Sequence, residues 1–81
     1  MNIYVGNLSY GVNESDLKEI FGEYGEVTSV KVIKDKFNGK SKGYAFVEMK
    51  NAEEGKKAIK ELDGGTLENR KVIVNEAKPR N

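Results

Sequence analysis

The sequence predicts an α+β fold: a four-stranded antiparallel sheet with two helices packed on one of its faces. Three observations lead to this prediction. Apolar residues recur at helical spacing in two segments, and β-branched and aromatic residues alternate in four others. The six segments follow one another in the order strand, helix, strand, strand, helix, strand. Helices that cover one face of such a sheet leave the other face open, so the character of that face decides what the chain can do.

Turn and capping residues delimit the first strand and the first helix. Ile3 to Val5 form a short β-rich start, and a glycine and an asparagine follow to stop it. Asn13 is a favoured helix N-cap, and the acidic side chains after it suit the positive end of the helix dipole. Gly25 suits the position just beyond the helix. The apolar stripe consists of Leu17, Ile20, Phe21 and Tyr24.

Two further strands are joined by a turn. Val27–Lys34 reads as a strand, and a loop with an Asn-Gly pair, a strong turn signal, follows at residues 35–40. Lys42–Met49 reads as the third strand. Alternation along the second strand places Val30 and Val32 on one face, and Lys31 and Ile33 on the other.

The second helix begins at Asn51, and Glu54 three residues later completes a capping-box signature. Gly64 and Gly65 end the helix, and Lys71–Glu76 reads as the last strand. The apolar stripe of this helix consists of Ala52, Gly55, Ile59 and Leu62. The resulting order, βαββαβ, is the ferredoxin-like motif.

Length and composition exclude several classes of function. The chain of 81 residues is one domain with a thin core, and we expect this core at about residues 2–77 with a short basic tail at residues 78–81. Cysteine and histidine are both missing. Disulfides, thiolate metal sites and the usual Ser-His or Cys-His nucleophile pairs are therefore excluded. We expect no enzymatic activity, no metal and no cofactor.

Charge and hydropathy bear on location and partners. The formal net charge is +1, which argues against binding a polyanion by charge alone. The sequence has no run of 18 apolar residues, and its first residues lack the pattern of a signal peptide. We therefore expect a cytoplasmic, monomeric protein that does not enter a membrane.

The open face of the predicted sheet carries aromatic side chains. Along the third strand the side chains alternate between two sets: Gly43, Ala45, Val47 and Met49 on one side, and Lys42, Tyr44, Phe46 and Glu48 on the other. The small and aliphatic set belongs under the helices, so Tyr44 and Phe46 point to solvent. The same alternation places Tyr4 outside on the first strand. Three aromatic side chains therefore form an apolar patch on a face that is exposed to solvent.

The segment Lys42–Met49, KGYAFVEM, resembles the octamer signature of the RNA-recognition motif, K/R-G-F/Y-G/A-F-V-x-F/Y. Six of the seven specified positions match, and Met49 departs from the aromatic residue expected last. Because Met49 lies on the core face, this departure should alter packing and leave RNA contact alone. Ile3–Leu8, IYVGNL, is similar to the companion hexamer on the first strand. The resemblance covers essentially the whole chain, and small single-domain bacterial RNA-binding proteins and the RNA-binding module of glycine-rich proteins are the members most similar to it.

The resemblance implies that the chain binds single-stranded RNA on the open face of its sheet. It implies that Tyr4 and Tyr44 stack on bases, that Phe46 packs between sugars or on a base, and that Lys42 contacts phosphate. Stacking on an aromatic face contributes about 1–3 kcal/mol per base for any base, so it can hold a strand on a nearly neutral domain. Single-stranded DNA stays open as a second ligand. Further binding residues are expected around the aromatic side chains: Lys31, Lys40, Asn75, Lys78 and Arg80.

The charges are unevenly distributed. Residues 34–42 hold four lysines against one aspartate, a local charge of +3, whereas residues 14–24 of the first helix hold four acids against one lysine, a local charge of −3. The pattern predicts a basic loop beside the aromatic face. For two residues the sequence leaves two possible roles open. Phe37 either stacks on a base or folds inward, and Glu48 either accepts a hydrogen bond from a base or is a plain surface residue.

Two other functions are compatible with a small ferredoxin-like domain. A protein–protein interaction module of the same fold is the main alternative, but such modules usually lose the stacking aromatic residues, which this chain keeps. An acylphosphatase-like enzyme would need an arginine in a phosphate-cradling loop. The only arginines, Arg70 and Arg80, lie near the end of the sequence.

Overall fold

The computed structural model describes residues 1–34 and 41–77, with residues 41 and 42 described by their backbone only. The described part contains two helices, α1 (Glu14–Gly22) and α2 (Ala52–Leu62). Its long strands are β1 (Asn2–Gly6), β2 (Val27–Lys34), β3 (Ser41–Met49) and β6 (Ile73–Glu76), and its two short ones are β4 (Thr66–Leu67) and β5 (Arg70–Lys71). The predicted element order is confirmed, with one added hairpin.

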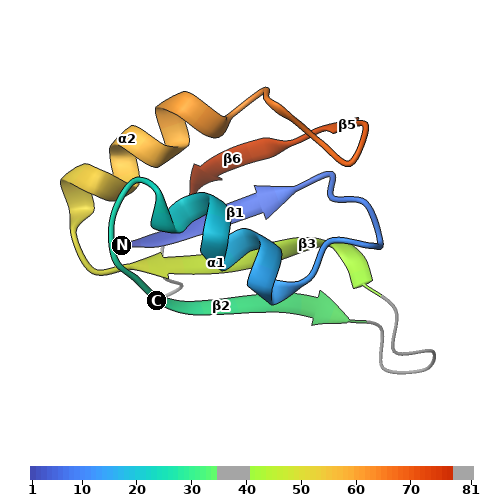
Figure 1. Cartoon of the computed structure of the whole chain (residues 1–81), viewed down its shortest axis with the longest axis horizontal. Coiled ribbons are helices and arrows are strands. Elements are labelled where there is room, and N and C mark those ends of the chain that lie inside the picture. Colours follow the sequence, from blue (N-terminus) through green and yellow to red (C-terminus); the bar gives the residue numbers. More distant parts are fainter. Residues whose placement is uncertain (35–40, 78–81) are drawn as a thin grey trace.

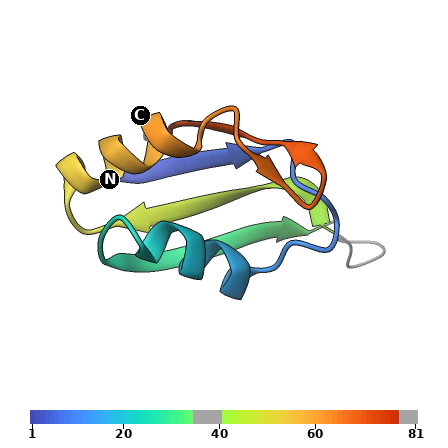
Figure 2. The same ribbon diagram turned by 45° about the horizontal axis from the view of Figure 1, so that its top comes forward.

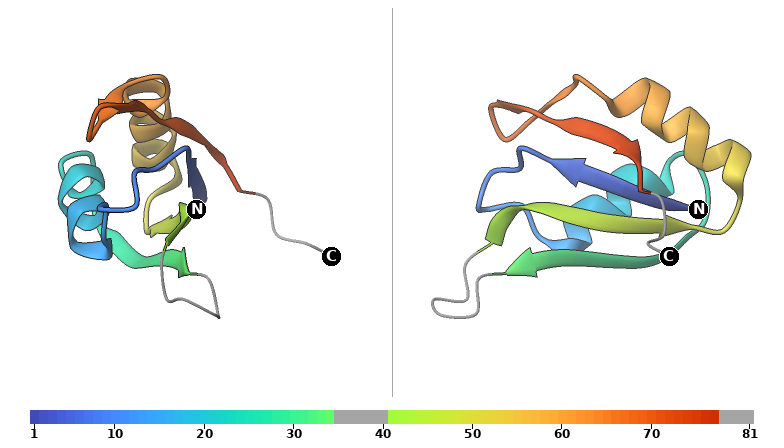
Figure 3. Two further views of the ribbon diagram at one scale, coloured as in Figure 1. Left: turned by 90° about the vertical axis from the view of Figure 1, so that its right-hand side faces the viewer. Right: turned by 180° about the vertical axis from the view of Figure 1, so that it is seen from behind.

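The four long strands form one antiparallel sheet in the order β2-β3-β1-β6 (Figure 1). Both helices lie on the same side of this sheet, as the turned view in Figure 2 and the side view in Figure 3 show. From behind, in the right panel of Figure 3, the strands face the viewer and the helices lie beyond them. The α+β, ferredoxin-like βαββαβ fold predicted from the sequence is confirmed.

The core lies between the sheet and the helices. On β3, Ala45, Val47 and Met49 are fully buried, which confirms the alternation predicted for this strand. They are joined by side chains from the other strands and from both helices, Ile3, Val5, Leu17, Phe21, Val32, Ala58 and Val74, and by Val72 between β5 and β6. Burial of apolar surface contributes about 25 cal/mol per Å², so this layer supplies the main stabilisation of a small domain.

The capping box occurs at the first helix and not, as expected, at the second. In α1 the Asn13 side chain accepts a hydrogen bond from the Asp16 amide (2.9 Å), and the Asp16 carboxylate accepts one from the Asn13 amide (3.0 Å). At α2, the Asn51 side chain accepts from the amides of Glu53 (2.9 Å) and Glu54 (3.1 Å). The Glu54 side chain lies over Gly25 instead, where an added Cβ would come within 2.5 Å of its Oε1. It therefore serves helix–loop packing and not the cap.

Three predicted details were wrong. The first helix ends at Gly22, so Tyr24 packs on the core from the following turn. Gly25 does not adopt a left-handed capping conformation, and it provides space for the side chain of Glu54. In α2, Ala52 is exposed at the first turn, and Ala58 is buried in its place. The stripe at helical spacing therefore consists of Gly55, Ala58, Ile59 and Leu62.

The predicted last strand is split at Val72. Thr66 and Lys71 pair with each other in the β4–β5 hairpin, and β6 begins only at Ile73. Glu68 and Asn69, both with φ in the left-handed region (52° and 64°), form the turn of this hairpin. The Val72 amide donates to the Gly65 carbonyl (2.8 Å), which ties the hairpin to the end of α2.

Two carboxylates bind backbone amides of the outermost strands of the sheet. Glu14 of α1 accepts a hydrogen bond from the Val32 amide of β2 (3.2 Å). Asp63, at the end of α2, accepts one from the Val74 amide of β6 (2.9 Å). Each helix is therefore fastened to the strand at its own side of the sheet by a side chain to backbone bond.

The alternation along β3 can be tested by folding stability. Met49→Ala should lower the free energy of unfolding by about 2–5 kcal/mol, because it removes a fully buried side chain and leaves a cavity. Phe46→Ala, on the opposite face of the same strand, should change it by no more than about 1 kcal/mol. Urea denaturation of both variants measures the difference. Equal losses would contradict the assignment of the two faces.

Candidate nucleic-acid interface

Three aromatic rings meet on the open face of the sheet, and we call them the aromatic platform: Tyr4 on β1, with Tyr44 and Phe46 on β3. Tyr4 lies directly across from Phe46 in the strand register. The ring centroids are 6.0 Å apart for Tyr4 and Tyr44, 5.9 Å for Tyr4 and Phe46, and 6.2 Å for Tyr44 and Phe46. Phe46 is 39% exposed. The three rings touch one another and still present apolar surface to solvent.

Two glycines lie beside the aromatic platform in the sequence, and one of them makes room for a ring. An added Cβ at Gly6 would lie 2.6 to 2.9 Å from the Tyr4 ring and hydroxyl, so the ring lies along its own strand over the bare backbone of Gly6. Gly43 has a φ of 88°, which favours glycine, and its carbonyl accepts the Leu8 amide (2.8 Å). From the sequence alone, Gly6 was predicted only to end the first strand. Its contact with Tyr4 shows that it also supports one ring of the platform.

One row of paired residues crosses the sheet at the level of the platform, with a polar residue at each end. Lys31 on β2 lies across from Phe46, and Asn75 on β6 lies across from Tyr4. Both side chains are exposed. The predicted positions of these two residues on the open face are confirmed, at opposite ends of one row of paired residues.

The remaining predicted binding residues are not placed by the structure. Lys40, Lys78 and Arg80 lie outside the described residues, as does Phe37. Lys42 belongs to β3, but its side chain lies outside the described part as well. Contacts between these side chains and phosphate therefore stay predictions.

The structure adds exposed residues that the sequence analysis did not single out. Tyr10, in the loop between β1 and α1, is 73% exposed. Asn2 and Ser29 both lie across from Glu48, and they extend the open face beyond the aromatic platform. An exposed tyrosine in a polar loop was readable from the sequence, whereas the register that brings Asn2 and Ser29 to Glu48 was not.

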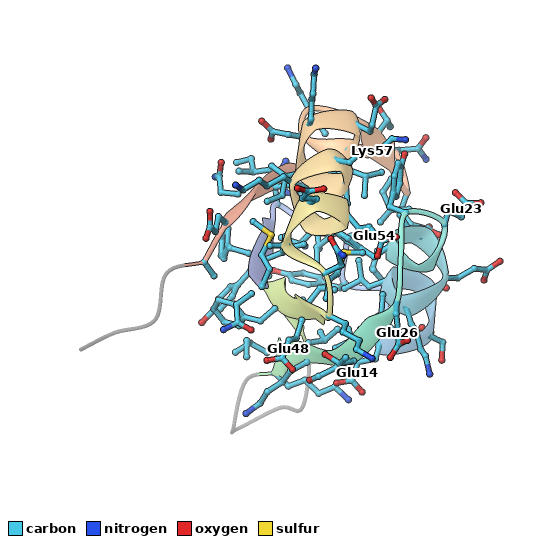
Figure 4. All side chains as sticks on the ribbon, turned by 90° about the vertical axis from the view of Figure 1, so that its left-hand side faces the viewer. Glu14, Glu23, Glu26, Glu48, Glu54 and Lys57 are labelled. Atoms are coloured by element: carbon cyan, nitrogen blue, oxygen red, sulfur yellow. The ribbon has the colours of Figure 1, made fainter. Side chains whose placement is uncertain are left out.

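Most of the acidic side chains labelled in Figure 4 lie away from the open face of the sheet. Figure 4 shows Glu23 and Glu26 on the side of α1, away from the open face, and Glu48 toward the opposite side, whereas Glu14 lies at the edge of the sheet, where it binds the Val32 amide of β2. Among the residues that the structure describes, Glu48 is therefore a carboxylate that the phosphates of a strand on the open face would meet, whereas Glu23 and Glu26 lie away from it.

The helical side contains a hollow of about 220 Å³ between α1, the end of α2 and β4. Its lining is mainly apolar and includes Leu17, Ile20, Phe21, Leu62 and Leu67. Small-molecule sites usually measure about 300–1,000 Å³, so this hollow is small for one. In residues 1–34 and 41–77, no group of three or more potential ligand side chains is arranged to hold a metal ion. Neither helix of the described part is long and apolar enough to cross a membrane.

Comparisons with known proteins agree with this geometry. The family model of the RNA recognition motif matches residues 3–73. RbpD of Nostoc sp., whose name provisionally assigns it RNA binding, is 50% identical over 80 residues, which are 99% of this chain and 85% of RbpD. The crystal structure of RNA binding protein PG1 is 48% identical, with a TM-score of 0.96 over 100% of this chain and 98% of PG1.

A further solved structure contains RNA. The RNA recognition motif of Rna15, solved with bound GU RNA, is 28% identical and has a TM-score of 0.86 over 96% of this chain and 83% of that one. The family-model match, the identity to RbpD and the shared fold all lead to one assignment. The chain belongs to the RNA recognition motif family.

Proposed function

We propose that this chain binds single-stranded RNA on the open face of its sheet, by stacking bases on the aromatic platform. The observation that carries the proposal is the meeting of three partly exposed rings, within 6.2 Å of one another, on a face that neither helix covers. Unpaired bases stack on such rings at about 1–3 kcal/mol each, whatever the base. Membership of the family and the RNA-bound structure of Rna15 support RNA as the ligand.

Lysines around the platform complete the proposed site. Lys31 lies beside Phe46 in the row that crosses the sheet. Lys42 is two residues before Tyr44 in the sequence of β3, and the resemblance to the family octamer assigns it a phosphate contact. We propose that these two contact phosphates, with Lys40, Lys78 and Arg80 extending the path of the strand and Asn75 binding a base or sugar. Single-stranded DNA would stack in the same way, and RNA is preferred only where the 2′-hydroxyl is contacted.

The proposed role is binding without catalysis. The sequence holds no histidine or cysteine to act as base or nucleophile. Cytoplasmic location and a monomeric state stay predictions. The apolar hollow on the helical side favours, as a second candidate, a protein contact away from the RNA face.

The stacking role can be tested by removing single rings. Phe46→Ala and Tyr44→Ala should each weaken RNA binding by about 1–3 kcal/mol, because each removes one stacking surface. Val47→Ala and Met49→Ala, which alter the buried face of the same strand, should leave the affinity of the folded molecules nearly unchanged. RNA titration followed by chemical shift measures all four. Weaker binding by Met49→Ala together with intact binding by Phe46→Ala would contradict the platform.

Gly6→Ala tests the placement of Tyr4 without removing any ring. The new methyl group would occupy the space of the Tyr4 ring, so the ring must turn away from the platform. We expect RNA affinity to fall by up to about 1–3 kcal/mol, the contribution of one stacked base. Gly22→Ala is the matched control, since an added Cβ there meets no atom within 4 Å. Equal affinities of the two variants would show that Tyr4 does not stack.

The share of charge in binding is measured by salt dependence. With about three phosphates neutralised on a single strand, log K should fall against log salt concentration with a slope near about −2. Lys42→Ala should reduce the magnitude of this slope by less than about one, the share of one phosphate contact.

A slope near about −6 would mean that charge and not stacking holds the RNA, which contradicts the proposal. Duplex RNA of equal length provides the control, because paired bases cannot lie flat on the platform. Equal competition by the duplex would point to recognition of shape or charge.

A further inference from the structure

Glu48 is held in place on the open face by an irregularity in β2. The register between β2 and β3 shifts between Val27 and Ser29, so Thr28 is an extra residue opposite Glu48. The Thr28 hydroxyl lies 2.9 Å from Oε1 of Glu48 and 3.1 Å from its backbone carbonyl oxygen. The hydroxyl can therefore donate to the carboxylate and orient it. Among the side chains that the structure describes, Thr28 is the only partner of this carboxylate.

The location of Glu48 relates it to bases stacked on the platform. Glu48 is two residues beyond Phe46 on the same face of β3, a distance of about 7 Å along a strand. A base stacked on Phe46 or Tyr4 can thus direct an edge toward the carboxylate. Asn2 lies directly across from Glu48 on β1 and is exposed, so its amide stands beside the same edge.

The chemistry of this pair distinguishes among the bases. A carboxylate only accepts hydrogen bonds, and its two oxygens suit two neighbouring donors. On the Watson–Crick edge, guanine alone presents two adjacent donors, N1–H and the 2-amino group, beside the acceptor O6. Adenine and cytosine present one amino donor next to an acceptor nitrogen, and uracil presents one N–H between two carbonyl oxygens. The Asn2 amide can donate to O6 while Glu48 accepts from the two nitrogens.

We infer that Glu48, oriented by Thr28 and assisted by Asn2, selects guanine at one position of the bound strand. This inference rests on the proposed function, since it requires a strand on the open face. A carboxylate there repels phosphate, so it weakens binding of every RNA that offers no matching donors. Its favourable contribution comes from hydrogen bonds to a charged acceptor, which are stronger than neutral ones. Glu48 would thereby convert a stacking surface that tolerates all bases into one with a preference.

The test uses three short RNAs of equal length: an oligouridylate, the same strand with one guanosine, and the same strand with one inosine, which lacks the 2-amino group. In a uniform background the protein can shift along the strand until the single purine reaches Glu48. The folded protein should bind the guanosine strand about tenfold more tightly than oligouridylate, the usual effect of a bidentate contact, with the inosine strand between them.

Glu48→Gln should reduce this preference to about threefold or less, because the amide keeps one acceptor and adds a donor. The preference is a ratio, so the general gain from losing a negative charge cancels. Thr28→Val should reduce it partly. Glu26→Gln, which removes an equal charge on the side of α1 (Figure 4), should leave it unchanged.

The outcomes separate this inference from the proposed function. Binding of all three RNAs with equal affinity, or a preference that persists in Glu48→Gln, would overturn the reading of guanine and leave the stacking site standing. No binding of any of the three would overturn both. A preference that is lost in Glu48→Gln and kept in Glu26→Gln supports the inference.

Discussion

The alternation of side chains along β3, with a period of two residues, is the constraint on which the rest of the structure depends. It sends Ala45, Val47 and Met49 into the core and directs Tyr44 and Phe46 to the other face. A shift of register by one residue would exchange these sets, so that aromatic rings would lie under the helices and the core would face water. Folding stability and the composition of the open face are thus fixed by a single register.

The rings of the aromatic platform contact one another without a further element of the described part of the chain to hold them together. Its rings come from two strands in register, and Gly6 leaves the space over its backbone to the Tyr4 ring. Because the rings already contact one another, the proposed stacking of bases would not have to order them. The proposed stacking on these rings does not depend on net positive charge, and the net charge of this chain is only +1.

The parts of the fold that follow from periodicity were predictable, and the parts that depend on individual side chain contacts were not. The bounds of β2, the two asparagine N-caps and the outward direction of the aromatic residues followed from alternation and capping preferences. The β4–β5 hairpin did not, because two-residue strands show no alternation and its Glu-Asn turn lacks a glycine. Likewise, Glu54 could have served the cap or the packing over Gly25, and only tertiary structure decides between them.

The candidate site shows the same division. Tyr4, Lys31 and Asn75 fell on the predicted face because each belongs to a strand with clear alternation. The contact of Gly6 with the Tyr4 ring, and the bond between Thr28 and Glu48, depend on a ring orientation and on an extra residue in β2. Neither leaves a mark in the pattern of apolar residues.

The two carboxylates that bind backbone amides of β2 and β6 also affect how the sheet meets other chains. An unpaired amide on an outer strand is a template on which a further strand can add, and this is how many sheets aggregate. Glu14 occupies the Val32 amide on one margin, and Asp63 occupies the Val74 amide on the other. Both margins of the sheet are thereby less receptive to a fifth strand.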